Sequence, residues 1–256
     1  MPCIFPLEIE EMILDLLAED DEGHSALKSC SLVCQAFLPI CRKHIFESIA
    51  LNSIYVESSP TVHAFDRLLR ETPEIADYIR EFDYNIRMTD LTNPSIQESW
   101  KRISRLKSLT VQQHYERNRY WSNILIRPAL LHLLHLPTLT HLSVSGINDF
   151  VVSDLIPCVN LQYLNIGPYT TVADEDTFPA ALPKHSIQLN KFVAGIGTAA
   201  TIMKLCTARR PDGQPIIDFG SLSKIKVVFR NHDEGELSQE LFGRCHVLTN
   251  AHISCK

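Results

Sequence analysis

The sequence predicts an α/β fold in which a small helical unit precedes a parallel sheet, and three observations predict it. One short apolar pattern occurs eight times between residues 46 and 253, and successive copies are 22 to 33 residues apart. Segments with the three- and four-residue apolar spacing of helices lie between the copies. Residues 6–45 show helical spacing before the pattern begins. Regular alternation of this kind favours a solenoid with a curved parallel sheet over an ordinary α/β domain.

Three short helices are expected at the start of the chain. Pro6 suits the first turn of a helix, where its missing N–H costs nothing. The apolar face of the first helix contains Ile9, Met12, Ile13, Leu16 and Leu17. A second helix is expected from residue 24 to Leu38, and Pro39 separates it from a third over residues 40–46. A unit of this size buries little apolar core by itself. We therefore expect it to pack against a partner or against the rest of the chain.

Each copy of the recurring pattern contains three apolar residues. Two residues separate the first from the second, and one residue separates the second from the third. Its copies are Phe46/Ile49/Leu51, Ile79/Phe82/Tyr84, Leu106/Leu109/Val111, Leu139/Leu142/Val144, Leu161/Leu164/Ile166, Leu189/Phe192/Ala194, Leu222/Ile225/Val227 and, weakly, Leu248/Ala251/Ile253. The last two members of each copy point to one side of a short strand. We expect them to be buried, and the residues around and between them to face outward.

Helices are expected between the strands, and two stretches are expected to be loops. The helical spacing covers residues 61–70, 95–105, 120–136, 149–156, 199–208 and 234–245, with Pro128 as a kink or break. The expected loops are residues 169–184 and 209–220, the second of which is rich in Pro and Gly. Either loop is a binding loop or a plain solvated connection.

Composition excludes several classes of function. The net charge is −6 with no long basic block, which disfavours a nucleic-acid partner. No apolar run approaches eighteen residues and the N-terminus lacks a signal pattern, so we expect a soluble protein with no membrane partner. Eight cysteines without a secretion signal favour free thiols in the cytoplasm or nucleus.

No motif for catalysis or metal binding stands out. The chain has no Gly-rich phosphate loop, no Gly-x-Ser-x-Gly and no His-Glu-x-x-His. Cys30, Cys34, Cys41 and His44 invite a zinc site, but they contain no Cys-x-x-Cys pair, and burial as small apolar side chains explains them better. We therefore expect no enzymatic activity, no cofactor and no metal.

The N-terminal residues resemble a known family. Phe5-Pro6-Leu7-Glu8-Ile9 and the run Cys30-Ser31-Leu32-Val33-Cys34-Gln35-Ala36-Phe37 are similar to the F-box, more narrowly to the F-box-like segment of basidiomycete fungal proteins. The resemblance covers residues 4–47. Phe5 stands where the family usually has leucine and Phe37 where it usually has tryptophan, so weaker docking is expected.

The resemblance implies that this segment binds a Skp-type adaptor, which joins it to a cullin ubiquitin ligase complex. An apolar helical surface suits a helical groove. The implied adaptor-binding residues are Pro6, Leu7, Ile9, Ile13, Leu14, Val33 and Phe37. The alternative is that these side chains only close the core of the three helices.

The remaining chain resembles an irregular leucine-rich-repeat array of the kind that follows many F-boxes. It departs from that family where an asparagine or cysteine usually follows the strand, since Ile147 and Tyr169 occupy two of those positions. We therefore predict an F-box-like helical domain over residues 1–47 and an irregular leucine-rich-repeat-like solenoid over residues 48–256.

These resemblances imply a substrate receptor of a Skp–cullin–F-box type ubiquitin ligase, with an unidentified protein target held by the repeats. The outward strand positions expected to contact the target are Asp83, Gln112, His141, Ser143, Tyr163, Asn165, Lys191, Lys224 and Lys226. They change from acidic to basic along the array, with Tyr163 as the expected anchor. The alternatives are plain solvated strand residues and, for the whole chain, a non-ligase repeat scaffold whose helices only cap the solenoid.

The last strand is expected to lack a covering helix, because the chain stops at Lys256 directly after it. An open edge favours pairing with another chain. We expect either a continuation beyond Lys256 or self-association through residues 248–254.

Overall fold

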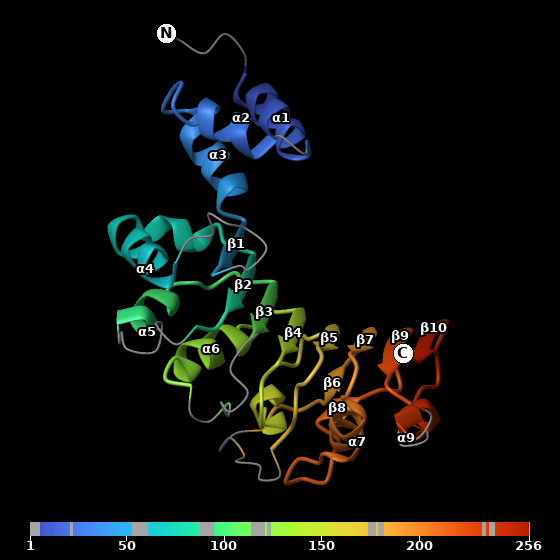
Figure 1. Cartoon of the computed structure of the whole chain (residues 1–256). Coiled ribbons are helices and arrows are strands. Elements are labelled where there is room, and N and C mark those ends of the chain that lie inside the picture. The colour runs from blue at the N-terminus through green and yellow to red at the C-terminus, as the bar shows by residue number, and fades with distance from the viewer. Residues whose placement is uncertain are drawn as a thin grey trace.

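The computed structural model describes residues 6–20, 23–52, 61–87, 95–113, 121, 124–173, 178, 182–231, 234–235 and 239–255. Within them the chain is an α/β protein with an eight-stranded parallel sheet whose strand order follows the chain. Figure 1 shows the strands side by side along an arc, with helices on the outer side of the arc and three helices gathered beyond its first strand. The inner side of the sheet is free of helices in this view.

The three N-terminal helices are α1 (Leu7–Ala18), α2 (Gly23–Cys30) and α3 (Phe37–Ile45). The expected second helix is therefore shorter than predicted, since turns occupy residues 31–36 and the third helix begins at Phe37. Pro39 lies in the first turn of α3 rather than between two helices. A proline is tolerated there because the first N–H groups of a helix have no partner within it.

All eight predicted strands are present, and their register is the predicted one. The strands are β1 (Ser48–Leu51), β2 (Glu81–Asn85), β3 (Ser108–Gln112), β4 (His141–Ser145), β5 (Tyr163–Ile166), β7 (Lys191–Ala194), β9 (Lys224–Phe229) and β10 (Asn250–Cys255). The middle apolar residue of each copy lies opposite that of the next, as in Leu109 opposite Leu142 and Leu142 opposite Leu164. The period-2 alternation of a strand with one buried face fixes this register, because a one-residue shift would expose the buried set.

The apolar side of the sheet forms one core with the outer helices. From β2 to β9 the inward pairs are buried, for example Leu164 and Ile166 at 0% exposure. At the first end of this core the Trp100 ring stands edge-on to Phe82 and Tyr84, with ring centres 5.0 and 5.2 Å away. Edge-to-face packing of this kind adds to the area that the rings bury.

Each of the six helices predicted between the strands has a counterpart in place but not in length, and the 3-10 helix η1 was not predicted. They are α4 (Val62–Glu71), the 3-10 helix η1 (Pro73–Asp77), α5 (Ser95–Trp100), α6 (Arg127–Leu134), the 3-10 helix η4 (Val152–Leu155), α7 (Ala199–Thr207) and α9 (Gln239–Gly243). The helix predicted over residues 120–136 begins later than predicted, at Arg127, and residues 120, 122 and 123 of that range lie outside the described residues. Of the two predicted roles of Pro128, the kink is wrong, because Pro128 lies in the first turn of α6. The helix predicted over residues 95–105 ends earlier than predicted, at Trp100. In place of the helix predicted over residues 149–156, the structure has the short 3-10 helix η4.

A second, two-stranded parallel sheet is formed by β6 (Ile187–Gln188) and β8 (Ile217–Asp218). β8 lies inside residues 209–220, which were predicted to be a loop, and the prediction is wrong for this part. Ile187 and Ile217 are both buried, so the short sheet adds to the outer layer of the core. Of the other predicted loop, residues 174–177 and 179–181 lie outside the described residues.

Candidate interaction surfaces

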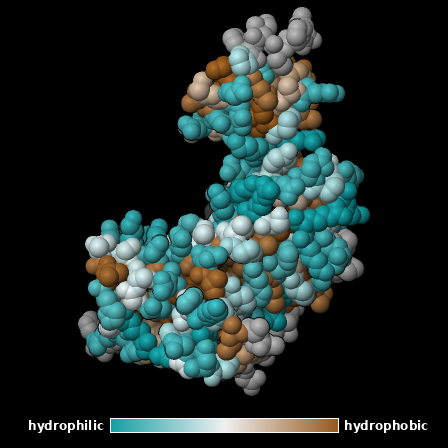
Figure 2. Space-filling model, turned by 180° about the vertical axis from the view of Figure 1, so that it is seen from behind, coloured by the Kyte–Doolittle hydropathy of each residue, from teal (hydrophilic) through white to brown (hydrophobic). Residues whose placement is uncertain are grey.

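Apolar side chains gather on the outside of the N-terminal helices. In the described part of the chain, thirteen large apolar side chains are exposed, and seven of them belong to residues 7–33. We call these seven the N-terminal surface: Leu7, Ile9, Met12, Ile13, Leu16, Leu32 and Val33. Figure 2 shows hydrophobic atoms concentrated on this part of the molecule. Concentrated apolar exposure of this kind marks an interaction site more often than a solvated face.

Five of the seven predicted adaptor-binding residues are exposed, and two are not. Leu7 is 56% exposed, Ile13 50% and Val33 71%, and Pro6 and Ile9 are exposed as well. Leu14 is 3% exposed and belongs to the core of the three helices, and Phe37 is half-buried against that core. Leu14 therefore supports the surface from beneath, and we leave it out of the surface.

The core of the N-terminal helices is small and separate from the core of the sheet. Its fully buried members are Leu14, Leu27 and Cys41, one from each helix. Burial raises the pKa of the Cys41 thiol, and the neighbouring Cys30 and Cys34 add to this shift. Cys41 is buried in this core and Cys30 packs against it, whereas Cys34 is half-buried and does not belong to the core. His44 points elsewhere, with its Nε2 atom 2.6 Å from the Asp15 carboxylate.

Polar contacts at the end of α3 join the N-terminal helices to the sheet. The Arg42 guanidinium lies 3.3 Å from the Glu74 carboxylate of η1. The Glu47 carbonyl accepts hydrogen bonds from the backbone N–H groups of Arg80 and Glu81 at 2.8 and 2.9 Å. None of these contacts involves a residue of the N-terminal surface.

A groove lies where β1 meets α4, at the first end of the sheet. Its volume is about 340 Å³, and it is lined by Phe46, Ile49, Ala64, Phe65, Arg67, Leu68 and Glu71. Its apolar lining is what a capping helix would cover. The residues of the N-terminal surface do not line it.

The outward positions of the strands form the second candidate surface, which we call the sheet face. The predicted target-binding residues all lie on strands of this face, with Asp83 and Gln112 on β2 and β3 and Lys224 and Lys226 on β9. Hydrogen bonds join neighbours across strands: the Gln112 amide donates to the Asp83 carboxylate at 3.2 Å, and the Asn165 amide donates to the Ser143 hydroxyl at 2.9 Å. The face is therefore an ordered polar surface, and Figure 2 shows a hollow between its far end and the N-terminal helices.

Three residues on neighbouring strands meet at the middle of the sheet face. His141, Tyr163 and Lys191 are aligned in register on β4, β5 and β7. The ring centres of His141 and Tyr163 are 5.5 Å apart, and the Lys191 ammonium lies 4.8 Å from the centre of the Tyr163 ring. Partial burial raises the pKa of the Tyr163 hydroxyl, which keeps it protonated as a donor.

A pocket of about 170 Å³ opens beside these rings. Its lining is His141, Gln162, Tyr163, Asn190 and Lys191. We call it the Tyr163 pocket. It has room for a side chain and is bordered by five residue types that can donate a hydrogen bond, including one ammonium group.

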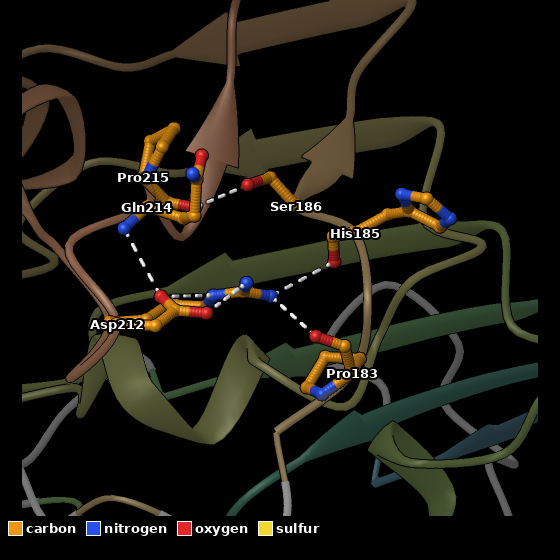
Figure 3. A network of polar contacts seen from close by, with 7 residues as sticks. Pro183, His185, Ser186, Asp212, Gln214 and Pro215 are labelled. Atoms are coloured by element: carbon orange, nitrogen blue, oxygen red, sulfur yellow. Dashed lines mark hydrogen bonds and ion pairs between the residues drawn. The ribbon is translucent and has the colours of Figure 1, made fainter.

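The region predicted as a second binding loop is held in place by the buried Arg210. Its guanidinium donates to both carboxylate oxygens of Asp212, at 3.1 and 2.5 Å, and to the carbonyls of Pro183 and His185. Figure 3 shows these acceptors gathered around one guanidinium group, beside the hydrogen bond from Ser186 to Pro215. The hydrogen bond from Arg210 lowers the pKa of Asp212. The arrangement is typical of a structural clamp, so we favour the sheet face over this loop as a binding surface.

Sequence reasoning missed part of the N-terminal surface. Met12 and Leu16 were placed on the apolar face of the first helix but not among the adaptor-binding residues, and the structure exposes both. The available signal was the width of the apolar face of α1, which exceeds what a helix of twelve residues buries against two short neighbours. Leu32 lies in the turn after α2, where no helical spacing points to it.

The side chains of His132, His135 and His141 contact three separate groups. His132 and His135 point to the backbone carbonyls of Ile103 and Asp154, and His141 to the Thr140 hydroxyl. In the described part of the chain no group of three or more His, Cys, Asp or Glu side chains is placed to hold a metal ion. The same residues contain no helix long and apolar enough to span a membrane.

Comparison with models of protein families gave no match for this chain. Comparison with curated proteins gave no significant match either.

Proposed function

We propose that the chain is the substrate receptor of a Skp–cullin–F-box type ubiquitin ligase. The three N-terminal helices act as an F-box-like unit that docks on a Skp-type adaptor. The sheet and its outer helices act as an irregular leucine-rich-repeat-like solenoid that holds a protein target on the sheet face. The chain performs no chemistry itself in this role, since it brings the target to the ligase.

The exposed N-terminal surface is the observation that carries the proposal. Leu7, Ile13 and Val33 are each at least half exposed, and the helices that present them have a core of their own. An amphipathic helix that lays apolar anchors into a groove of a partner is a common mode of recognition. The surface is apolar enough to need a partner and is not covered by the described part of the chain.

The rival function is a repeat scaffold whose N-terminal helices only cap the solenoid. A cap would press its apolar side chains onto the first end of the sheet. The groove at β1 and α4 is instead lined by Phe46, by Ile49 of β1 and by residues of α4, and no residue of the N-terminal surface lines it. These two observations favour the receptor over the scaffold.

The test is co-purification with a Skp-type adaptor. A double variant, Leu7→Asp with Ile13→Asp, should abolish adaptor binding while the far-ultraviolet circular dichroism and the melting temperature stay near those of the parent. Leu125→Asp is the matched control, because it places the same charge at an apolar side chain that is 61% exposed outside the N-terminal surface. Adaptor binding by the folded double variant, or none by the parent, would contradict the proposal and favour the scaffold.

A further inference from the structure

Three lysines lie together on the sheet face. Lys191 lies directly opposite Lys224 on the neighbouring strand, and Lys226 follows on the same side of β9. We call these three the lysine cluster. In the described part of the chain no ion pair is formed by any of the three. Like charges directly opposite each other destabilise a sheet. The lysine cluster therefore lowers the stability of the fold unless a bound anion compensates for its charge.

Among the described residues, the strand and pocket neighbours of the lysine cluster add donors, and none of these neighbours has a carboxylate. On one side it meets the Tyr163 pocket, where Lys191 already contacts the aromatic ring. On the other side His252 of β10 lies opposite Lys226. An oxyanion in the pocket would meet an ammonium group, a phenol hydroxyl and the amides of Gln162 and Asn190 together.

We infer that the sheet face over β5, β7 and β9 binds a negatively charged segment of a protein partner, with one acidic side chain in the Tyr163 pocket and others along the lysine cluster. This inference rests on the proposed function, because it assigns the charge of the target that the receptor holds. It predicts carboxylate or phosphate groups on that segment.

The opposite end of the sheet face excludes a uniform polyanion. Glu81 and Asp83 occupy the same two rows of the face on β2 that Lys224 and Lys226 occupy on β9. A nucleic acid that lay along the whole face would meet these carboxylates and a chain of net charge −6. A protein segment whose acidic residues lie only over the basic end of the sheet face avoids repulsion at the acidic end. The change of charge along the face would then fix the direction in which the segment binds.

The test uses the full chain and three short labelled peptides of the same length, in which glycine alternates with glutamate, phosphoserine or glutamine. Fluorescence anisotropy at low ionic strength measures the Kd of each. We expect the glutamate peptide, the phosphoserine peptide or both to bind, with an affinity that falls as salt is added. Which of the two binds more tightly identifies the anion. Binding of neither, or equally tight binding of the glutamine peptide, would overturn the inference.

A triple variant tests the place of binding. Lys191→Gln, Lys224→Gln and Lys226→Gln together should weaken binding of the acidic peptide by about tenfold. The control removes three exposed lysines elsewhere, with Lys28→Gln, Lys101→Gln and Lys184→Gln. Both variants have a net charge of −6 − 3 = −9, so a difference between them reports position and not total charge. An equal loss in both would overturn the inference.

Two variants of Tyr163 test the pocket. Tyr163→Phe keeps the ring under Lys191 and removes the hydroxyl, so it should weaken binding less than Tyr163→Ala, which removes both. Parent-like binding by Tyr163→Ala would remove the pocket from the inference and contradict it as stated. Adaptor binding is measured on the same samples, because loss of the adaptor with retained peptide binding counts against the ligase role alone, and the reverse counts against the acidic segment alone.

Discussion

Leu142 of β4 lies directly opposite Leu164 of β5, and both side chains are almost completely buried, at 1% and 0% exposure. The pair lies in the middle of the inward row that runs through every strand of the sheet. Removing either side chain leaves a cavity with close-packed walls, because the helices of the outer layer and the neighbouring strands hold the site from all sides.

We therefore expect Leu142→Ala and Leu164→Ala each to lower the free energy of unfolding by about 2–5 kcal/mol. Urea unfolding followed by circular dichroism measures this loss. His141→Ala is the control on the same strand, since His141 is exposed, and a surface change of this kind alters stability by about 0.5 kcal/mol or less. Unfolding curves of the two leucine variants that overlay the parent would contradict the inward assignment.

The small core of the N-terminal helices should respond independently of the sheet. Leu14→Ala removes one of three fully buried side chains there, so we expect the amides of α1, α2 and α3 to lose protection from hydrogen exchange while the strands keep theirs. Ile13→Ala, at the exposed neighbouring residue, is the matched control and should change the protection of neither the helices nor the strands. Equal loss of protection in the strands would show that the helices and the sheet unfold as one unit.

Two buried thiols should make stability fall at high pH. Burial raises the pKa of Cys206 from 9.0 to about 12, and burial beside Asp154 raises that of Cys158 further. Below pH 9 the thiols are protonated in both states, and their contribution is fully present. Above pH 9 the unfolded thiols ionise while the folded ones remain protonated, so the free energy of unfolding falls as pH rises toward the folded pKa.

The measurement is the urea midpoint at pH 8 and at pH 10.5. Cys158→Ala and Cys206→Ala should each reduce the decrease between the two pH values, because each removes one such thiol. Cys255→Ala, at an exposed thiol of β10, should leave the decrease unchanged. The same decrease in all four proteins would mean that other groups cause it.

How much of this fold was predictable differs between strands and helices. The strands and their register followed from residue pairs such as Leu142/Val144 and Leu164/Ile166, since alternation with one buried side admits one register. The ends of the helices could not be predicted from the sequence in the same way, because a proline is compatible both with a break between helices and with the first turn of a helix. Pro39 and Pro128 each lie in the first turn of a helix, and tertiary packing decides this. The strands β6 and β8 are two residues long and too short for a period to appear.

The sheet face was predictable and the N-terminal surface only in part. The contact of His141, Tyr163 and Lys191 follows from register, since aligned outward positions are neighbours. In α1, by contrast, apolar residues cover more than one side of the helix, and their spacing does not tell which side is buried. Leu14 and Ile13 are adjacent in the chain, but the first is buried and the second exposed.

The buried Arg210 should hold the segments 183–186 and 209–215 together. Arg210→Met leaves the carbonyls of Pro183 and His185 and the Asp212 carboxylate without their donor, so we expect a loss of about 1.5–3 kcal/mol. Limited proteolysis should cut these segments faster in the variant. Arg209→Met, at the exposed neighbour, is the control. Arg210→Lys should not restore resistance, because one ammonium group does not reproduce the planar fork. Unchanged proteolysis would show that the clamp is dispensable.

The last strand is placed to pair with another chain. β10 pairs with β9 along all six of its residues and is the final strand of the sheet in the described part of the chain. Its inward positions, Ala251 and Ile253, are exposed, unlike the same positions from β2 to β9. An edge strand with exposed apolar side chains and free backbone groups is a template for strand addition. We therefore expect self-association through residues 248–254 as the protein concentration rises.

Sedimentation equilibrium over a wide concentration range checks this expectation. Ile253→Lys should shift the equilibrium toward monomer, because a lysine on an edge strand repels its copy and removes the apolar contact at once. Val247→Lys is the matched control, since Val247 is as exposed as Ile253, at 52% against 54%, and lies outside the strand. If Val247→Lys acts as strongly as Ile253→Lys, a general charge effect explains the change. A parent protein that stays monomeric at the highest concentration would show that the open edge of β10 does not pair with itself.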